Sequence, residues 1–301
     1  MKGRFLFPHY CRWIGLLLAI PGFVLGYFNV YHEFFFKQLT FNEEQLQVVF
    51  GCGNLTDEIA LALVVCGLML IAFAKEKIED ELTARLRLDA LYWAILINYL
   101  GFLLFEIVFF ILAKADVYYH DSNLKVDGIN SDYGIYNFFT PLLIFIFRFN
   151  YLLHYKKGNL VSPALRYLNY YPYRKIGEKG TWICLILIAL LTWDVKFPTP
   201  IDVYIVLCYP LLFMFLLMWV YSRNPEEDEL TMHFRLESMQ LAVYVNCALL
   251  LIANFAFYGF DFLAVMLINL VSIPLFFVIR FTYVSNKAYW QARNEMKGGI
   301  I

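Results

Sequence analysis

The sequence predicts an all-α polytopic membrane protein with about eight transmembrane helices, arranged as two parallel four-helix repeats. Three observations lead to this fold class. Of the 301 residues, 61% are hydrophobic and 16% are charged, whereas a soluble domain carries about 25% charged residues. Apolar runs long enough to cross the hydrocarbon core of a bilayer recur along the chain. A charged phrase of twenty residues also occurs twice.

Eight apolar runs are candidate membrane spans. They cover about 12–31, 57–74, 88–113, 135–153, 181–196, 201–221, 236–257 and 262–283. The first run follows a basic N-terminus and could be a signal peptide. It contains Pro21 and lacks a clear cleavage site of small residues, so we interpret it as a retained helix. The fifth run has the weakest signal, because Trp193 and Asp194 lie at its end.

The basic residues predict the orientation. With the N-terminus in the cytoplasm, 20 of the 24 Lys and Arg residues fall in or beside cytoplasmic segments. The exceptions are Lys37, Lys114, Lys125 and Lys196. By the positive-inside rule we expect a multi-pass protein with both its N- and C-termini in the cytoplasm.

The repeated phrase defines two units. Residues 79–98 (EDELTARLRLDALYWAILIN) and 227–246 (EDELTMHFRLESMQLAVYVN) are identical at nine of twenty positions, where chance gives about one or two. The run that follows matches as well, since NFFTPLLIFIFRFNY (137–151) aligns with NLVSIPLFFVIRFTY (269–283). We therefore predict a first four-helix unit at 1–153, a cytoplasmic linker at 154–180 and a second four-helix unit at 181–301. Because four is even, the units share one orientation, related by a pseudo-two-fold axis along the membrane normal.

The phrase carries acidic, basic and amide side chains in phase. At 100° per residue, positions seven and eleven apart fall on one helix face. The candidate polar cluster is Asp80, Arg87 and Asn98 with Asp228, Arg235 and Asn246. One interpretation is a capped cytoplasmic helix start whose charges are solvated or reach the membrane interface. The other is a buried charge cluster across the pseudo-two-fold axis, on which a ligand or ion site could be built.

The second copy also carries a helix-start signal of its own. In NPEEDEL, Asn224 is the predicted N-cap, with Pro225 at the first helical position and Glu227 at the third.

Two further intramembrane positions are candidates. Glu106 aligns with Asn254, and an ionisable residue within a span costs about 2.5–3.5 kcal/mol to insert, which marks it as a functional-site candidate. The alternative is that Glu106 reaches the headgroups at the outer end of a long helix. The paired asparagines Asn98/Asn246 and Asn137/Asn269 are expected to form interhelical hydrogen bonds.

The sequence contains no motif of an enzyme site. It has no phosphate-binding loop, nucleophile elbow, HExxH or paired-cysteine motif. We therefore predict no catalytic residues, no metal, no cofactor and no nucleic-acid partner.

Two segments resemble a known family. FAKEKIEDEL and RLRLDALYWAILIN in the first half, and YG…NLVSIPLFFVIRFTY in the second, are similar to small uncharacterised multi-pass inner-membrane proteins of Bacteroidota, usually one four-helix unit long. The resemblance covers about half of the chain and implies a bacterial source and the inner (plasma) membrane, but no activity. The second copy departs from the pattern where Arg223-Asn224-Pro225 replaces the stretch with Lys75 and Lys77.

Two classes of function remain. The first is a non-enzymatic scaffold, sensor or complex subunit, embedded in the lipid bilayer, that binds a protein partner through the acidic cytoplasmic elbows EKIEDEL and NPEEDEL. The alternative is a small-solute or ion transporter or channel with its path along the pseudo-two-fold axis. An intramembrane enzyme is disfavoured, because no base, nucleophile or metal set converges.

Overall fold

The structure is a computed structural model, and it is all-helical, as predicted. It describes residues 5–32, 36, 55–77, 79–119, 139–156, 167–193, 201–224, 228–257 and 260–298. The α-helices of these residues are α1 (Cys11–His32), α3 (Thr56–Ala72), α4 (Glu81–Tyr119), α6 (Thr140–Tyr151), α7 (Lys175–Trp193), α8 (Ile201–Val220), α9 (Glu229–Ala256) and α10 (Phe260–Gly298). Two π-helical turns, η3 (Leu152–Lys156) and η4 (Tyr170–Arg174), flank the middle of the chain.

Three helices of the described residues are long and apolar enough to cross a membrane. They are Cys11–Asn29 within α1, Glu81–Phe105 within α4, and α9. Cys208–Val220 within α8 is a shorter apolar helix. These lengths and compositions are compatible with membrane insertion.

Each predicted apolar run overlaps one helix, but several helix ends differ from the prediction. Helices α4 and α9 begin at Glu81 and Glu229, before their apolar runs, because a charged turn precedes the apolar part of each. Helix α7 begins at Lys175, inside the predicted linker. Charged first turns are tolerated because helix starts favour carboxylates and need few apolar side chains.

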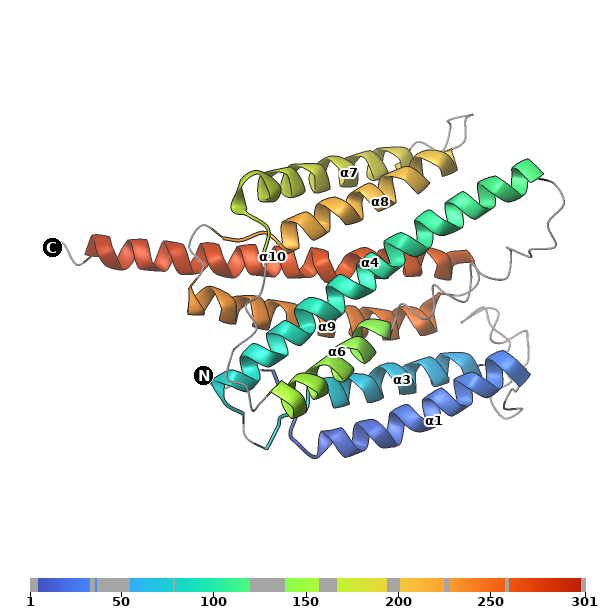
Figure 1. Ribbon diagram of the computed structural model, residues 1–301, viewed down its shortest axis with the longest axis horizontal. Coiled ribbons are helices and arrows are strands. Elements are labelled where there is room, and N and C mark those ends of the chain that lie inside the picture. The colour runs from blue at the N-terminus through green and yellow to red at the C-terminus, as the bar shows by residue number, and fades with distance from the viewer. Residues whose placement is uncertain are drawn as a thin grey trace.

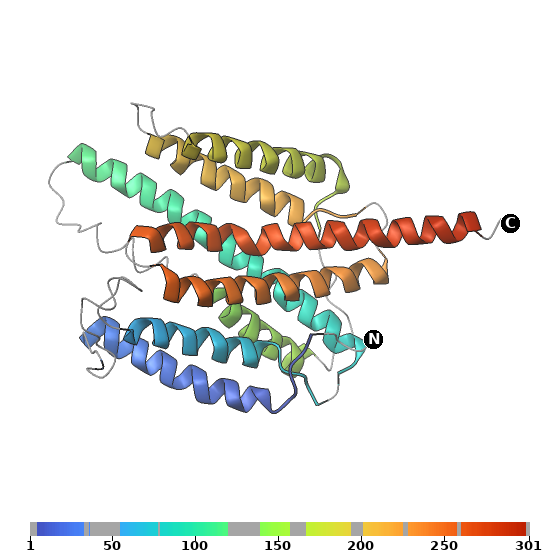
Figure 2. The ribbon, with the colours of Figure 1, turned by 180° about the vertical axis from the view of Figure 1, so that it is seen from behind.

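The helices run side by side between two ends of a bundle (Figure 1). The hairpins α1–α3 and α7–α8 lie at opposite edges, with α4 and α6 on one face and α9 and α10 on the other (Figures 1 and 2). We name the end where α4 and α9 begin the elbow end, and the opposite end the far end. The first elbow is 73–77 with 79–80, and the second elbow is 221–224 with 228. The last turns of α10 project beyond the other helices at the elbow end (Figure 2).

Each elbow is fixed by a segment that precedes another helix, α1 for the first elbow and α7 for the second. Phe7 forms a parallel bridge with Ala74, and Leu168 forms the same bridge with Ser222. The four hydrogen bonds are Phe7 N to Phe73 O (2.9 Å), Lys75 N to Phe7 O (2.8 Å), Leu168 N to Tyr221 O (2.8 Å) and Arg223 N to Leu168 O (2.9 Å). Ala74 and Ser222 lie 148 residues apart in sequence, the same offset as the repeated phrase.

The two halves of the chain contact each other through aromatic side chains at these elbows. The Tyr244 ring of α9 lies edge-on to Phe73, with centroids 4.7 Å apart. The Tyr92 ring of α4 lies edge-on to Tyr221, with centroids 4.6 Å apart, and the Tyr221 hydroxyl donates to the Tyr92 carbonyl (2.8 Å). Phe73 and Tyr221 are aligned positions, so each half places an aromatic residue of its third helix on the other half's elbow.

Helices α1 and α3 approach closely at a glycine. A Cβ added at Gly67 would lie 2.5 Å from Ala19 N and 2.7 Å from Gly15 O, both backbone atoms. This contact therefore requires glycine at position 67. Gly26 lies on α1, seven residues after Ala19, and a Cβ added there would have no atom within 4 Å.

Candidate functional site

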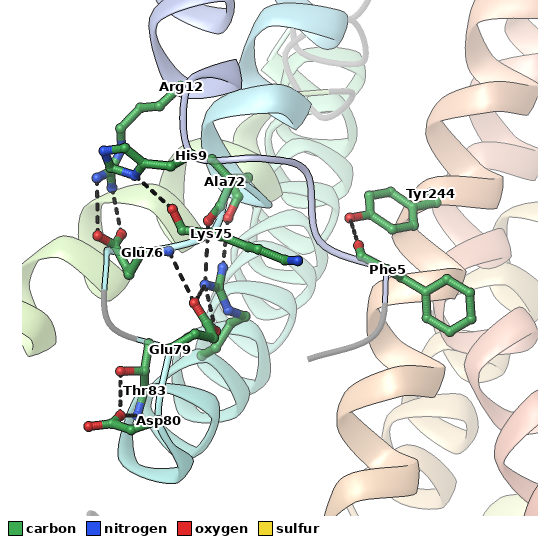
Figure 3. A network of polar contacts seen from close by, with 12 residues as sticks. Phe5, His9, Arg12, Ala72, Lys75, Glu76, Glu79, Asp80, Thr83 and Tyr244 are labelled. Atoms are coloured by element: carbon green, nitrogen blue, oxygen red, sulfur yellow. Dashed lines mark hydrogen bonds and ion pairs between the residues drawn. The ribbon is translucent and has the colours of Figure 1, made fainter. Parts of the chain in front are cut away.

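The two copies of the charged phrase start their helices in the same way. Asp80 Oδ1 accepts hydrogen bonds from Thr83 N (2.7 Å) and Thr83 Oγ1 (2.6 Å) (Figure 3). Asp228 Oδ1 accepts hydrogen bonds from Thr231 N and Thr231 Oγ1, both at 2.8 Å. These bonds hold the pKa of the Asp228 carboxyl below its ordinary value. Both aspartates are exposed helix caps at the elbow end.

The predicted N-cap of the second copy is wrong. The N-cap of α9 is Asp228, not Asn224. The Asn224 Oδ1 instead accepts a hydrogen bond from Arg174 Nη1, which ties the second elbow to η4. A Ser, Thr, Asp or Asn at either position satisfies the N-cap preference, and local sequence did not distinguish them.

Arg87 is buried, and its guanidinium group donates hydrogen bonds to the first elbow and to the end of α3. Its side chain is 1% exposed. Nη1 donates to Ala72 O (3.2 Å), and Nη2 donates to the two carboxylate oxygens of Glu79 (3.2 and 3.3 Å). The guanidinium carbon lies 4.6 Å from the ring centroid of Phe149 on α6. Arg87 therefore joins the end of α3, the elbow and α6.

Arg235 occupies the same position in the second half. It is 1% exposed, and its Nη1 and Nη2 donate to Val220 O (3.1 Å) and Ser222 O (2.7 Å). Its guanidinium lies over the rings of Tyr167 (4.4 Å) and Phe281 (4.7 Å). We name these the first and second arginine sites. Their carbonyl acceptors are aligned residues, since Arg87 Nη2 also donates to Ala74 O (3.5 Å).

The six residues of the predicted polar cluster do not form one cluster in the structure, because each type of residue has different partners. The aspartates cap helices at the surface, and the arginines are buried against the elbow of their own half. The two phrases do contact each other at a different residue. Arg85 Nη2 binds Glu81 Oε1 at 2.7 Å and Glu229 Oε1 at 3.0 Å, which joins the exposed starts of α4 and α9.

The asparagines of the cluster join the third helix of each half to the fourth. Asn98 Oδ1 accepts a hydrogen bond from Thr140 Oγ1 (2.5 Å). Asn246 Oδ1 accepts hydrogen bonds from Asn269 Nδ2 (3.2 Å) and Ser272 Oγ. Thr140 and Ser272 are aligned, so the same contact occurs twice. These bonds match the interhelical role expected from the sequence.

The second candidate pair is described for one member only. Asn254 is buried, and its Nδ2 donates to the carbonyl oxygen of Glu58 on α3 (2.9 Å). Glu106 lies in α4, but its side chain falls outside the described part of the structure, as does all of Asn137. Asn254 therefore ties α9 of the second half to α3 of the first.

A narrow cleft lies between α4 and α9 at the elbow end. Its polar lining residues are Glu79, Arg87, His233, Glu237 and Gln240. It has room for about one water molecule. This cleft brings charged groups of both halves together, but it is too small for a solute.

Sequence reasoning missed one ion pair. Arg148 of α6 donates to Asp89 Oδ2 of α4 through Nε (3.0 Å) and Nη2 (2.8 Å), and its guanidinium lies 5.1 Å from the Trp93 ring centroid. Both residues stand at aligned positions, Asp89 with Glu237 and Arg148 with Arg280. The sequence did contain a signal for this ion pair, because an acidic residue on the third helix and an arginine on the fourth occur at aligned positions in both halves.

Comparison of the chain with protein-family models, curated proteins and solved structures found no match. The resemblance to the inner-membrane family of Bacteroidota therefore stays a prediction.

Proposed function

We propose that this chain is an integral membrane protein of non-enzymatic type, a scaffold, sensor or complex subunit that binds a protein partner at its elbow end. In this proposal the helices form two tandem four-helix units of the same orientation, and the elbow end and both termini lie in the cytoplasm. The resemblance to bacterial inner-membrane proteins supports that location.

Membrane insertion is supported by the outward faces of the edge helices. Helix α1 exposes Trp13, Leu17 and Ile20, and α7 exposes Trp182 and Ile183. Soluble monomers rarely expose contiguous apolar patches larger than a few hundred Å². Lipid chains are the natural contact for whole helix faces of this composition.

The tandem arrangement is supported by contacts that occur twice. Both halves have the backbone bridge at the elbow, the buried arginine on its carbonyls, and the asparagine-to-hydroxyl bond between the third and fourth helices. Equivalent contacts at aligned residues are expected when one chain contains two copies of a unit.

The observation that carries the partner proposal is the ion pair between Arg85 and Glu229. It brings the starts of α4 and α9 together into one exposed surface, which we name the acidic elbow surface: Asp80, Glu81, Asp228 and Glu229. Two of these carboxyl groups bind Arg85 and the other two cap the helix starts, so the carboxyl groups outnumber the arginine and favour a partner with a basic segment. The end of α10, with exposed Tyr289 and Trp290, extends beyond the bundle on the same side and offers aromatic contacts of the kind enriched at interfaces.

The transport alternative has less support. A path along the axis requires polar groups that face a water-filled space. Asn98, Asn246 and Asn254 are instead hydrogen-bonded between helices, and the cleft between α4 and α9 has room for about one water molecule. The exposed charges therefore favour binding at the elbow end over conduction through the bundle.

The test is a charge reversal of the acidic elbow surface in the source cells. We expect the wild-type protein, extracted with mild detergent, to migrate on native gels in a complex heavier than the chain alone. Glu81→Lys with Glu229→Lys should release the chain from that complex, and higher salt should weaken it.

Glu178→Lys is the matched control, because Glu178 is also exposed at the elbow end but begins α7. It should leave the complex intact. The same migration for all variants, or no partner beyond the chain itself, would refute the proposal.

A further inference from the structure

Helix α7 has one exposed face on which lysines lead directly into apolar side chains. At 100° per residue its members fall within about 80° of one another around the helix. They are all exposed, and we name them the α7 stripe: Lys175, Lys179, Trp182, Ile186 and Leu190. The proposed partner surface does not use them.

The opposite face of α7 packs closely on α8. A Cβ added at Gly177 would lie 2.7 Å from Trp219 N, and one added at Gly180 would lie 2.5 Å from the Phe215 ring. These two glycines lie about 140–200° around the helix from Lys175. Because the α7–α8 hairpin forms an edge of the bundle, the stripe faces away from the other helices (Figure 1).

The elbow end of α7 carries a net positive charge. Lys175 and Lys179 form no ion pair with an acidic side chain of the described residues. The Lys175 Nζ lies 5.5 Å from the ring centroid of Tyr171, which is exposed. Together η4 and α7 contain three basic residues, of which Arg174 is the third, and one acidic residue, Glu178.

The dimensions of the stripe match one leaflet of a bilayer. Lys179 and Leu190 are eleven residues apart, which is about 17 Å along an α-helix. Half of the hydrocarbon core measures about 15 Å. Trp182 lies between the lysines and the apolar side chains, at the level where tryptophan is enriched in membrane proteins.

We propose that the α7 stripe binds an anionic phospholipid, with the phosphate group at Lys175 and Lys179 and an acyl chain along Trp182, Ile186 and Leu190. The inference rests on the membrane insertion proposed above, with the elbow end in the cytoplasm. Anionic lipids of the cytoplasmic leaflet attract basic segments next to a transmembrane helix. A lipid fits better than a free anion, because the lysines continue without a break into an apolar face.

The opposite edge of the bundle differs in its charge. Helix α1 also exposes an apolar face, with Trp13 and Leu17. The cation next to Trp13 is Arg12, and its Nη2 lies 3.0 Å from Glu76 Oε1 and donates to Asn150 Oδ1 at 3.2 Å. The charge of Arg12 is therefore compensated within the protein, whereas the two lysines of α7 remain exposed to a ligand.

Native mass spectrometry of the full-length protein in detergent micelles tests the proposal. The probes are phosphatidylglycerol and phosphatidylcholine with identical acyl chains. Each basic residue near an anionic membrane surface contributes about a fivefold factor in affinity, so the two lysines should favour phosphatidylglycerol by about 25-fold. Lys175→Gln with Lys179→Gln should remove this preference and leave the affinity for phosphatidylcholine unchanged.

Lys75→Gln with Lys77→Gln is the matched control, because these lysines are also exposed at the elbow end but lie in the first elbow. It removes the same charge and should keep the preference. Glu178→Lys should increase the preference, because it replaces the acidic side chain of this segment with a basic one.

Equal affinities of the wild-type protein for the two lipids would overturn the proposal. An equal loss in the two double-lysine variants would overturn it as well, since it would indicate an effect of net charge alone. So would displacement of phosphatidylglycerol by glycerol phosphate at the same concentration, which would indicate a site for a free anion.

Flotation of the protein with lipid vesicles separates this inference from the proposed function. A chain that does not float with the vesicles refutes membrane insertion, and with it the lipid site. A chain that floats but binds both lipids equally refutes the lipid site alone. The measurement uses the purified chain, so its result does not depend on the protein partner proposed for the acidic elbow surface.

Discussion

Removal of the second arginine tests whether the repeated phrase is structural. In Arg235→Met the carbonyl oxygens of Val220 and Ser222 lose their donors, and both residues are buried. A buried acceptor left without a partner costs about 1–3 kcal/mol, so the two together cost about 2–6 kcal/mol. The methionine recovers part of the packing against Tyr167 and Phe281. We therefore expect a loss of about 3–4 kcal/mol in the free energy of unfolding, within the range for breaking a buried charged network.

The matched control is Arg85→Met. Arg85 lies on the other third helix and is exposed, and its ion pairs with Glu81 and Glu229 are at the surface. Exposed ion pairs contribute about 0–1 kcal/mol, so the loss should stay below about 1 kcal/mol. The assay is reversible denaturant unfolding of the full-length protein in micelles, followed by far-ultraviolet circular dichroism. A loss for Arg235→Met no larger than that for Arg85→Met would refute the reasoning.

The double variant Arg87→Met/Arg235→Met separates two structural hypotheses. Each arginine donates to carbonyl groups of its own half, so the two losses should add to within about 0.5 kcal/mol. A single cluster across the pseudo-two-fold axis, one of the two interpretations of the sequence, predicts a large coupling. A coupling well above about 1 kcal/mol would therefore favour the shared network.

Two further predictions concern the helix ends and the helix crossings. Asp228→Ala should cost about 1 kcal/mol at neutral pH, as other N-cap replacements do. Because the folded state lowers the Asp228 pKa, this stabilisation is present above the ordinary pKa of 3.8 and is lost as the pH falls through the lowered folded value, so unfolding curves of the variant and the wild type should converge in acid. Gly67→Ala should cost about 1–3 kcal/mol or more, because its Cβ would lie 2.5 Å from Ala19 N. Gly26→Ala has open space and should be neutral or stabilising in the same melting experiment; equal effects of the two changes would contradict the close contact.

The sequence predicted the helices well because their signal is local. Apolar runs of sufficient length located a helix in each predicted span, and the aligned phrases identified equivalent positions in the two halves. The helix starts were less accurate. The first turn of a helix is defined by one hydrogen-bonded cap, and both Asn224 and Asp228 have suitable side chains.

The sequence could not predict what the arginines contact. We placed Asp80 on the same helix face as Arg87 by assuming that both residues are helical. Asp80 instead precedes the first residue of α4 and caps it, so the helical spacing does not apply to it. The acceptors that Arg87 and Arg235 have in common are main-chain carbonyl groups at or just after the end of another helix, and every residue carries such a group. Only the tertiary fold selects which carbonyl groups are left without a helical partner and close enough to bind.

The ion pair beside each arginine site differs between the halves. In the first half Asp89 binds Arg148. The second half has both corresponding residues, but the nearest cationic-type group to Glu237 Oε1 is His233 Nε2 of its own helix, at 3.2 Å. Glu237 Oε1 and Arg280 Nε are both buried without a hydrogen-bond partner among the described residues. The halves therefore share the hydrogen bonds that hold the elbow and differ in the charges next to them.

A second difference between the halves lies at the acidic elbow surface, where we place the partner. Position 85 in the first phrase is an arginine that reaches across to Glu229, whereas the aligned His233 turns inward to Glu237 and lines the cleft beside Arg87. The acidic elbow surface is therefore not symmetric, although the helices beneath it are held by equivalent contacts. A partner that binds both phrases at once meets two different charge arrangements, so the surface favours one asymmetric partner over two identical ones.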